Sequence, residues 1–397
     1  MSLQHFFRLM LVGVIALLLA ATLSPPGRVG AAASNAHVHY IYADDGLCPD
    51  SIDGYQITGG KLVPTPGMPY SAGKTSRTQL MVFGYNTLAV TPANSVHGPC
   101  LVHSDGSQAQ VESFTIDPAT GVLTLASTVS ALSKDPSSLA KDVRISSNGN
   151  LVYVSITPGG GPTGNLSSLS LGTGCMLKLD QQFPVPTQTY DSLLLVSASR
   201  MVAINLSRHG IDTYALTPTG GITFVNSVSG RLSGTDGVAD QTFTTKAGKQ
   251  VTILYTGQFR LSIKPGSNAQ AGQYTPSTGA FSSLASSPQK DLGGISLDYL
   301  LFNTANHYLI GTESFSGSLG VWSAANFTFK FFGHVRLPSG VSEPTTMAQI
   351  GTQLFVIGGN SVIVRCTITA VAPGVTNCAI AANLSGNGGG VEGVAIF

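Results

Sequence analysis

The amino-acid sequence predicts an all-β protein, a seven-bladed β-propeller of four-stranded antiparallel blades preceded by a signal peptide. Three observations support this. A short apolar strand and a strand–turn–strand hairpin alternate seven times, the repeat spans about 50 residues, and the last residues look like one isolated strand. Charged residues make up only 10% of the chain, far below the roughly 25% of ordinary globular domains. Such a composition fits many tight turns and uncharged strand faces.

The first 36 residues have the pattern of an export signal. Arg8 ends a short polar start, residues 9–23 are almost wholly apolar, and small residues at 31–36 offer cleavage sites. An apolar run this short falls below the roughly 20 residues that a membrane-spanning helix needs. We therefore expect residues 1–36 to be a removed signal peptide and residues 37–397 to form the propeller. An uncleaved N-terminal anchor is the alternative.

The mature chain is nearly neutral. Without Arg8 and Arg28 it keeps 18 basic residues, against 19 acidic ones. A protein that neutralises many phosphates needs a surplus of Lys and Arg on one face, so nucleic acid is not expected as a partner. We expect a monomer that is secreted, periplasmic or on the cell surface, and not inserted in a membrane after cleavage. Its partner would be a small ligand, a glycan or an envelope protein.

The first half of the repeat is an apolar run rich in Val, Ile, Leu and Tyr and bounded by Gly, Asn and Ser, which is typical of a buried strand. It occurs at 37–44, 79–84, 148–156, 192–198, 249–257, 306–314 and 352–359. The second half is a hairpin, at 52–67, 111–128, 165–182, 211–227, 271–287, 319–335 and 362–381. In turns such as 118–121, an early Pro fixes φ and a late Gly permits a positive φ.

Matching hairpin positions define the blade. They are Tyr55, Phe114, Leu169, Tyr214, Tyr274, Trp322 and Arg365. One such sheet cannot bury both of its faces, but seven sheets packed radially can. The terminal segment 390–397 should pair with the first mature strands, joining the ends in one blade and removing the open edge. Six or eight blades remain alternatives, because the third and seventh repeats are degenerate.

All five cysteines lie in the mature chain, where export permits disulfides. Cys366 and Cys378 flank one predicted hairpin and are expected to pair. Cys48 with Cys100 is a second expectation, which leaves Cys175 over. None of the five has CxxC spacing, so we expect no zinc site and no cofactor.

Three segments repeat a common blade pattern: FTIDPATGVLT at 114–124, ISSNGNLVYVS at 145–155 and GGKLVPTPGMPYSAG at 59–73. They resemble the lactonase-type seven-bladed propellers, the 6-phosphogluconolactonase-like proteins that share repeats with YVTN surface-layer proteins. The resemblance spans nearly the whole mature chain and implies the fold. The family's enzymes act on phosphogluconolactone or form muconolactone, and they usually carry a His-rich segment just before one such strand. The matching stretch here, 139–144, has no histidine.

The functional expectation follows from that departure. We expect a non-catalytic propeller that binds a ligand, a glycan or a protein, and the alternative is a hydrolase of small lactones working in the central channel. Lys141, Asp142 and Arg144 are the densest charge cluster and precede a predicted inner strand. They could form a polar floor for an anionic or sugar-like ligand, or merely an ion-paired loop.

Two acidic residues complete the candidate site. Glu313 ends the sixth predicted inner strand and Glu343 lies just before the seventh. Either could act as a general base if the ring brings it near His307 or Arg144. The candidate catalytic residues are therefore Lys141, Asp142, Arg144, His307, Glu313 and Glu343.

A metal site is not expected. Asp44, Asp45, Asp50 and Asp53 fall within ten residues, and carboxylates can hold Ca²⁺. Their spacing does not match the EF-hand loop, so we expect turn-forming residues in a surface loop.

Overall fold

The computed structural model describes residues 38–45, 51–72, 86–105, 109–130, 132–133, 138–158, 163–186, 190–205, 210–229, 235–258, 268–290, 297–385 and 393–397. The predicted signal peptide, the apolar run 79–84 and Cys48 lie outside the described residues. Residues His39–Phe397 form one compact unit. In the part of the chain that the structure describes, no helix has the length and apolar character needed to cross a membrane.

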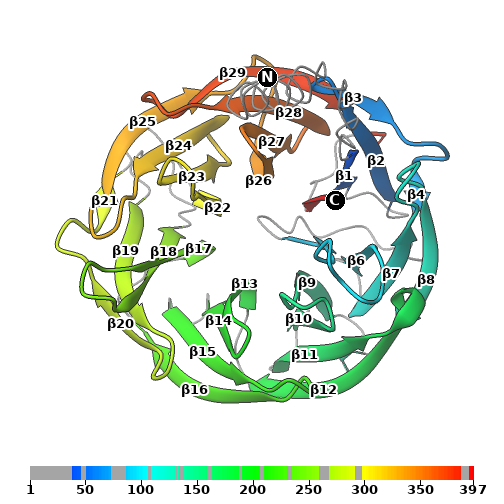
Figure 1. The fold of residues 1–397 in the computed structure, drawn as a ribbon, viewed down its shortest axis with the longest axis horizontal. Helices are drawn as coiled ribbons and strands as arrows, with labels where there is room; N and C mark the ends of the chain where they lie inside the picture. Colours follow the sequence, from blue (N-terminus) through cyan, green and yellow to red (C-terminus); the bar gives the residue numbers. More distant parts are fainter. Residues whose placement is uncertain are drawn as a thin grey trace, which may run out of the picture. The chain divides into compact units, whose positions relative to one another are not determined.

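Seven antiparallel sheets surround a common axis (Figure 1). We number these blades 1 to 7 in chain order. From the axis outward they are β30-β1-β2-β3, β5-β6-β7-β8, β9-β10-β11-β12, β13-β14-β15-β16, β17-β18-β19-β20, β22-β23-β24-β25 and β26-β27-β28-β29. The predicted all-β propeller with four-stranded blades is confirmed.

The strand bounds are as follows. Innermost strands are β30 (Val394–Ile396), β5 (Leu88–Val90), β9 (Leu139–Ile145), β13 (Tyr190–Ser197), β17 (Thr235–Thr244), β22 (Leu297–Asn303) and β26 (Pro344–Ile350). Second strands are β1 (His39–Asp44), β6 (Cys100–Asp105), β10 (Leu151–Thr157), β14 (Arg200–Asn205), β18 (Gln250–Gln258), β23 (Tyr308–Glu313) and β27 (Gln353–Gly358).

Third strands are β2 (Ser51–Thr58), β7 (Gln110–Ile116), β11 (Thr163–Leu171), β15 (Gly210–Leu216), β19 (Asn268–Thr275), β24 (Ser318–Ser323) and β28 (Val362–Ile368). Outermost strands are β3 (Lys61–Pro64), β8 (Leu123–Val129), β12 (Leu177–Pro186), β16 (Ile222–Val228), β20 (Ala280–Ser283), β25 (Lys330–Arg336) and β29 (Val375–Asn383). Two short strands, β4 (Tyr70–Ser71) and β21 (Gln289–Lys290), pair with β2 and β19.

The ring closes through the two ends of the compact unit. The C-terminal strand β30 pairs antiparallel with β1, with Ile396 opposite Ile41 and Val394 opposite Ala43. The backbone N–H groups of Tyr40 and Phe397 each donate to the other residue's carbonyl, at 2.9 and 2.8 Å. One C-terminal strand and three N-terminal strands therefore share blade 1, as predicted.

The seven matching hairpin positions all lie on third strands, one in each blade. Six of these side chains are buried and Arg365 is half-buried. The apolar side chains cluster mainly between neighbouring blades: one cluster joins Val102 of β6 to Val154 of β10, and another joins Ile310 of β23 to Val356 of β27. The core is thus a ring of contacts between blades.

The predicted apolar runs need a correction in one blade. Five of the seven runs coincide with second strands, but the run at 192–198 falls on the innermost strand β13. The second strand of blade 2 is β6, which the sequence did not indicate. Innermost and second strands are both apolar, so hydrophobicity alone did not fix which strand faces the axis.

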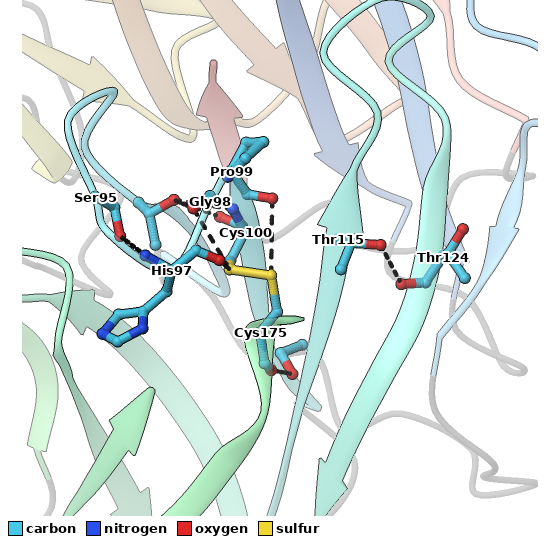
Figure 2. The surroundings of a disulfide bond; sticks show 10 residues. Ser95, His97, Gly98, Pro99, Cys100, Thr115, Thr124 and Cys175 are labelled. Carbon is cyan, nitrogen blue, oxygen red and sulfur yellow. Dashed lines mark hydrogen bonds between the residues drawn. A yellow bond between two sulfur atoms is a disulfide. The ribbon is translucent and has the colours of Figure 1, made fainter. Parts of the chain in front are cut away.

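Two disulfides are present. Cys366 pairs with Cys378, as expected, with an S–S distance of 2.03 Å. Cys100 pairs with Cys175 at 2.04 Å, so the expected pairing of Cys100 with Cys48 is wrong. Figure 2 shows this second bond between Cys100, at the start of β6, and Cys175, in the 3-10 turn Thr173–Cys175. It ties blade 2 to blade 3.

Candidate functional site

An ion pair lies on the innermost strand β9 of blade 3. The Arg144 guanidinium donates from Nη2 to Asp142 Oδ2 at 2.9 Å, and its Nε lies 2.8 Å from Oδ1 as an ion pair. Asp142 is fully buried, whereas the Arg144 side chain remains 21% exposed. Two groups of blade 4 also donate to Asp142, the backbone N–H of Leu193 at 3.0 Å and the Ser192 hydroxyl at 3.3 Å. Oδ2 of Asp142 therefore accepts three hydrogen bonds, and Oδ1 is held by the ion pair with Arg144.

A β-bulge puts Asp142 in this place. The register of β9 against β10 shifts so that Lys141 and Asp142 together oppose Ser155, whose hydroxyl accepts the Asp142 N–H at 3.0 Å. The innermost strands β13, β17 and β22 shift in the same way. Bulges re-aim side chains next to functional sites, and the bulge of β13 brings Ser192 and Leu193 to Asp142.

Burial dominates the electrostatics of this pair. It raises the pKa of Asp142 to about 6, although Arg144, the Leu193 N–H and Ser192 all act to lower it. Burial opposes the charge on Arg144 as well, but Asp142 and Tyr299 outweigh it and raise the pKa of the guanidinium above its ordinary value. Arg144 is thus a permanent cation.

Arg144 also extends across the axis. Its guanidinium interacts with the hydroxyl of Tyr299 on β22, which lies on the opposite side of the axis from β9 (Figure 1). The Tyr299 N–H donates to Thr312 Oγ1 at 3.0 Å, the same bond that Asp142 makes with Ser155. Asp142 and Tyr299 therefore occupy equivalent bulge positions in blades 3 and 6.

Another carboxylate on an innermost strand is Asp240 of β17. When the innermost strands are aligned at their bulges, Asp240 occupies the position that Ile145 holds in β9 and Leu195 holds in β13. This position follows that of Arg144. Burial raises its pKa to about 6. In the described part of the chain Asp240 makes no hydrogen bond or ion pair, and its side chain is only half-buried. It is a carboxylate with free lone pairs near neutral pH.

A cavity of about 350 Å³ lies between blades 3 and 4. It is lined from β9 and its turn, from β10, from β13 and its turn, and from β15, by Ile145, Ser146, Ser147, Tyr153, Leu195, Val196, Ser197, Ala198 and Leu216.

The structure does not bring the six predicted site residues together. Lys141, Asp142 and Arg144 lie on the innermost strand itself, not before it. Glu313 ends β23, which is a second strand, and His307 precedes the other end of the same strand. His307 Nδ1 lies 3.4 Å from Gln241 Nε2, at the opposite end of β23 from Glu313.

Glu313 instead pairs with His334 of β25. The His334 Nδ1 lies 3.0 Å from each carboxylate oxygen, and the Ser316 hydroxyl donates to Oε2 at 3.0 Å. Glu313 is fully buried, and this group belongs to the body of blade 6. Glu343 lies just before β26 and is half-buried.

The structure also corrects the expectation that the aspartates near residue 50 lie in a surface loop. Asp44, Asp45 and Asp53 are buried, not in a surface turn, and Asp50 lies outside the described residues. Asp44 accepts the Thr87 hydroxyl at 2.6 Å and lies 3.4 Å (Oδ2) from His103 Nε2. Among the described residues, no group of three or more His, Cys, Asp and Glu side chains could hold a metal ion.

Comparisons place this geometry on a known fold. No family model and no curated protein matches the sequence. The periplasmic gluconolactonase of Pseudomonas aeruginosa has a similar structure, with 15% identity and a TM-score of 0.64 over 90% of this chain and 99% of its own. A protein of Bacteroides fragilis described as a 6-phosphogluconolactonase gives 13% identity and a TM-score of 0.65, over 92% of this chain and 99% of its own. The chain has the lactonase-propeller fold.

Within this lactonase-propeller fold, sequence reasoning missed Asp240. The signal lay in the repeat itself, because the equivalent positions of blades 3, 4 and 6 hold Ile145, Leu195 and Phe302. A carboxylate where the other blades have an apolar side chain is a departure that superposing the innermost strands would have exposed. His334 offered no comparable signal, since it lies on an outermost strand with alternating exposure.

Proposed function

We propose that this protein hydrolyses small lactones at the axis of the ring. The observation that carries the proposal is the Arg144 guanidinium, which buried Asp142 fixes in place and which reaches Tyr299 across the axis. A fixed cation of this kind can bind the carbonyl oxygen of a lactone and stabilise the negative charge that develops on it during attack by water. Of the two functions that the sequence left open, the gluconolactonase neighbour supports this one.

Asp240 is the proposed general base. A base works best when its pKa lies near the working pH, and burial gives Asp240 a pKa of about 6. Its carboxylate would take a proton from water as the oxygen of that water attacks the carbonyl carbon. The same proton would then pass to the ring oxygen as the ester C–O bond breaks, which leaves a hydroxy acid. Asp142 is a positioning residue, because Arg144, Ser192 and Leu193 donate to its Oδ2 and the ion pair with Arg144 holds its Oδ1.

The disulfides support an extracytoplasmic location for this activity. Cys100–Cys175 and Cys366–Cys378 would persist in an oxidising compartment and not in a reducing cytosol. We propose that the protein works outside the cytoplasm as a monomer, on a small neutral lactone.

The test is a hydrolysis assay of the purified protein against γ-butyrolactone, δ-valerolactone and glucono-δ-lactone, followed by acid release at constant pH. We expect Arg144→Gln to lower kcat/KM about 10²- to 10³-fold, which is the usual effect of removing one group that stabilises an oxyanion. Tyr299→Phe, which keeps the Asp142–Arg144 ion pair intact, should lower kcat/KM about tenfold. Arg336→Gln is the matched control, because Arg336 is exposed on the outermost strand β25.

Thermal melts of each variant separate lost activity from lost fold. Arg144→Gln leaves Asp142 buried without its partner, so Tyr299→Phe decides the outcome if the first variant unfolds. Turnover no faster than the uncatalysed rate on every lactone would overturn the proposal and favour a non-catalytic binding propeller. Full activity in Tyr299→Phe and in a folded Arg144→Gln would show that the active site does not lie at the axis.

A further inference from the structure

Four innermost strands, β9, β13, β17 and β22, share one bulge pattern, in which two residues oppose a single residue of the second strand. A bulge takes backbone groups out of the ladder, and a buried N–H or C=O group without a partner is unfavourable. The residue opposite the bulge is Ser155 in blade 3, Ile204 in blade 4, Gly257 in blade 5 and Thr312 in blade 6. Among these four strands, a hydroxyl therefore lies opposite the bulge only in the blades that carry Arg144 and Tyr299.

In blade 3, side-chain hydroxyls bind the backbone of both bulge residues. The Ser155 hydroxyl accepts the N–H of Asp142 at 3.0 Å. From blade 2, the Ser104 hydroxyl donates to the C=O of Lys141 at 2.8 Å. Both serines are fully buried, so bulk water does not compete for these hydrogen bonds. The two hydroxyls therefore stabilise the bulge against regular strand pairing.

The bulge decides where the Arg144 side chain lies. Asp142 is bound to the N–H of Leu193 in blade 4, and Arg144, two residues further along β9, lies on the same face of the strand. Val143, between them, packs in the apolar cluster shared with blade 2. A slip of one residue turns every later side chain of a strand to the other face. If the pairing beyond the bulge slipped to a regular ladder, Arg144 would turn toward blade 2 and leave the axis.

Thr312 holds the corresponding bulge of blade 6. Its Oγ1 accepts the N–H of Tyr299 at 3.0 Å, and its hydroxyl donates to the C=O of Thr345 in blade 7 at 3.4 Å. Thr312 is fully buried. One hydroxyl thus fixes the backbone of Tyr299 relative to its own blade and to the next blade.

We infer that Ser104, Ser155 and Thr312 are positioning residues of the proposed hydrolytic site. They bind the backbone of the bulges in β9 and β22, so that Arg144 and Tyr299 meet across the axis. The inference rests on the proposed function for what this contact does in the reaction, but the anchoring of the bulges can be measured without turnover.

The first experiment measures hydrogen exchange of the Arg144 Nε–H by NMR, in protein that contains isotope-labelled arginine. The signal is assigned by its absence in Arg144→Lys. We expect Ser155→Ala and Ser104→Ala each to speed this exchange about tenfold, the usual worth of one hydrogen bond. Ser167→Ala is the matched control, because Ser167 is a fully buried serine on the third strand of the same blade, where its hydroxyl donates to Asn165 Oδ1 at 2.9 Å.

The second experiment measures kcat/KM for δ-valerolactone. We expect Thr312→Val, which keeps the shape of the side chain but not its hydroxyl, to lower kcat/KM about tenfold. Thr312→Ser, which keeps the hydroxyl, should match the wild type. In the Tyr299→Phe background, Thr312→Val should cause no further loss, because the hydroxyl that Thr312 positions is already absent. An equal loss in both backgrounds would overturn the role of Thr312, and thermal melts confirm that each variant is folded.

The outcomes separate the anchoring from the proposed function. Unchanged exchange in Ser155→Ala and Ser104→Ala, or the same increase in Ser167→Ala, would overturn the anchoring whatever the activity. Ser104→Ala decides the outcome if Ser155→Ala does not fold, because it leaves the N–H of Asp142 with its partner. Faster exchange in both anchor variants, with no hydrolysis of any lactone, would overturn the proposed function and support the anchoring.

Discussion

At the scale of single residues, two carboxylates of the innermost strands, Asp142 and Asp240, have different environments. Asp142 is buried, and its carboxylate accepts hydrogen bonds from Arg144 and from two groups of blade 4. Asp240 is half-buried with none of these bonds, yet burial raises its pKa to about 6 as well. A charged group that is held without compensation lowers stability, and proteins keep such groups mostly where function needs them.

The pH dependence of stability tests the state of Asp240. Its pKa is higher in the folded protein than the ordinary value of 3.8, so the folded state binds more protons between about pH 4 and pH 6. The ionised Asp240 carboxylate is therefore unfavourable in the folded protein, and the free energy of unfolding falls as the pH rises through 6. Asp240→Asn, which carries no charge, should match the wild type at pH 4.

At pH 7.5 the same variant should be more stable than the wild type by about 1–2 kcal/mol. This is less than the roughly 3 kcal/mol of the full pKa shift, because Asp240 is partly open to solvent. Denaturant unfolding at the two pH values measures the difference. Asp180→Asn is the control, since Asp180 is exposed on the outermost strand β12. A loss of stability at pH 7.5 would show that the charge has a partner.

At the scale of elements, the tight turns show which glycines the blades require. Gly121 has φ +72°, and a Cβ there would lie 2.3 Å from the ring of Tyr40, which belongs to the neighbouring blade 1. Gly248 has a similar φ of +77° but open space around it. The turn containing Gly121 was predicted from its sequence, whereas the contact with Tyr40 was not.

These two glycines form a matched pair of substitutions. Gly248→Ala should lower the free energy of unfolding by about 1 kcal/mol, the usual penalty of a left-handed conformation for a residue with a Cβ. Gly121→Ala should lower it by about 3 kcal/mol, because overpacking against Tyr40 adds to that penalty. Denaturant unfolding of both variants measures the two losses, and equal losses would show that the Tyr40 contact relaxes freely.

The elements also show why only part of the site followed from sequence. Repeat length, hairpin turns and the terminal strand are local patterns, and they predicted the propeller and its closure. Which strand of a blade faces the axis depends on how sheets assemble, so Glu313 was expected nearer to the centre than β23 lies. The Arg144–Tyr299 contact joins opposite blades, and the Asp142–Leu193 contact joins neighbours. No local pattern encodes either contact.

At the scale of the whole molecule, two covalent links act over different lengths of chain. Cys100–Cys175 spans 75 residues and joins two blades, whereas Cys366–Cys378 spans 12 residues within blade 7. A longer closed loop removes more conformational entropy from the unfolded chain. Replacing both cysteines of the first pair by serine should lower the free energy of unfolding by about 4.5 kcal/mol, and the second pair by about 3 kcal/mol.

Denaturant unfolding of the two double variants under oxidising conditions checks this order. A smaller loss for the pair that links blades 2 and 3 would mean that the unfolded chain keeps those blades in contact even without the bond. The ring is also closed by the hydrogen bonds between β1 and β30, so both variants should still fold.

The most direct test of the central claim, a hydrolytic site at the axis with Asp240 as its base, is the pH profile of kcat/KM for δ-valerolactone between pH 4.5 and 8.5. For the wild type we predict that kcat/KM rises about tenfold per pH unit below pH 6 and then levels, with an apparent pKa near 6, because water attack needs the ionised carboxylate. In Asp240→Asn we predict a loss of at least about 10² and no inflection near pH 6. An unchanged profile in this variant, or a wild-type profile without an inflection, would contradict the claim.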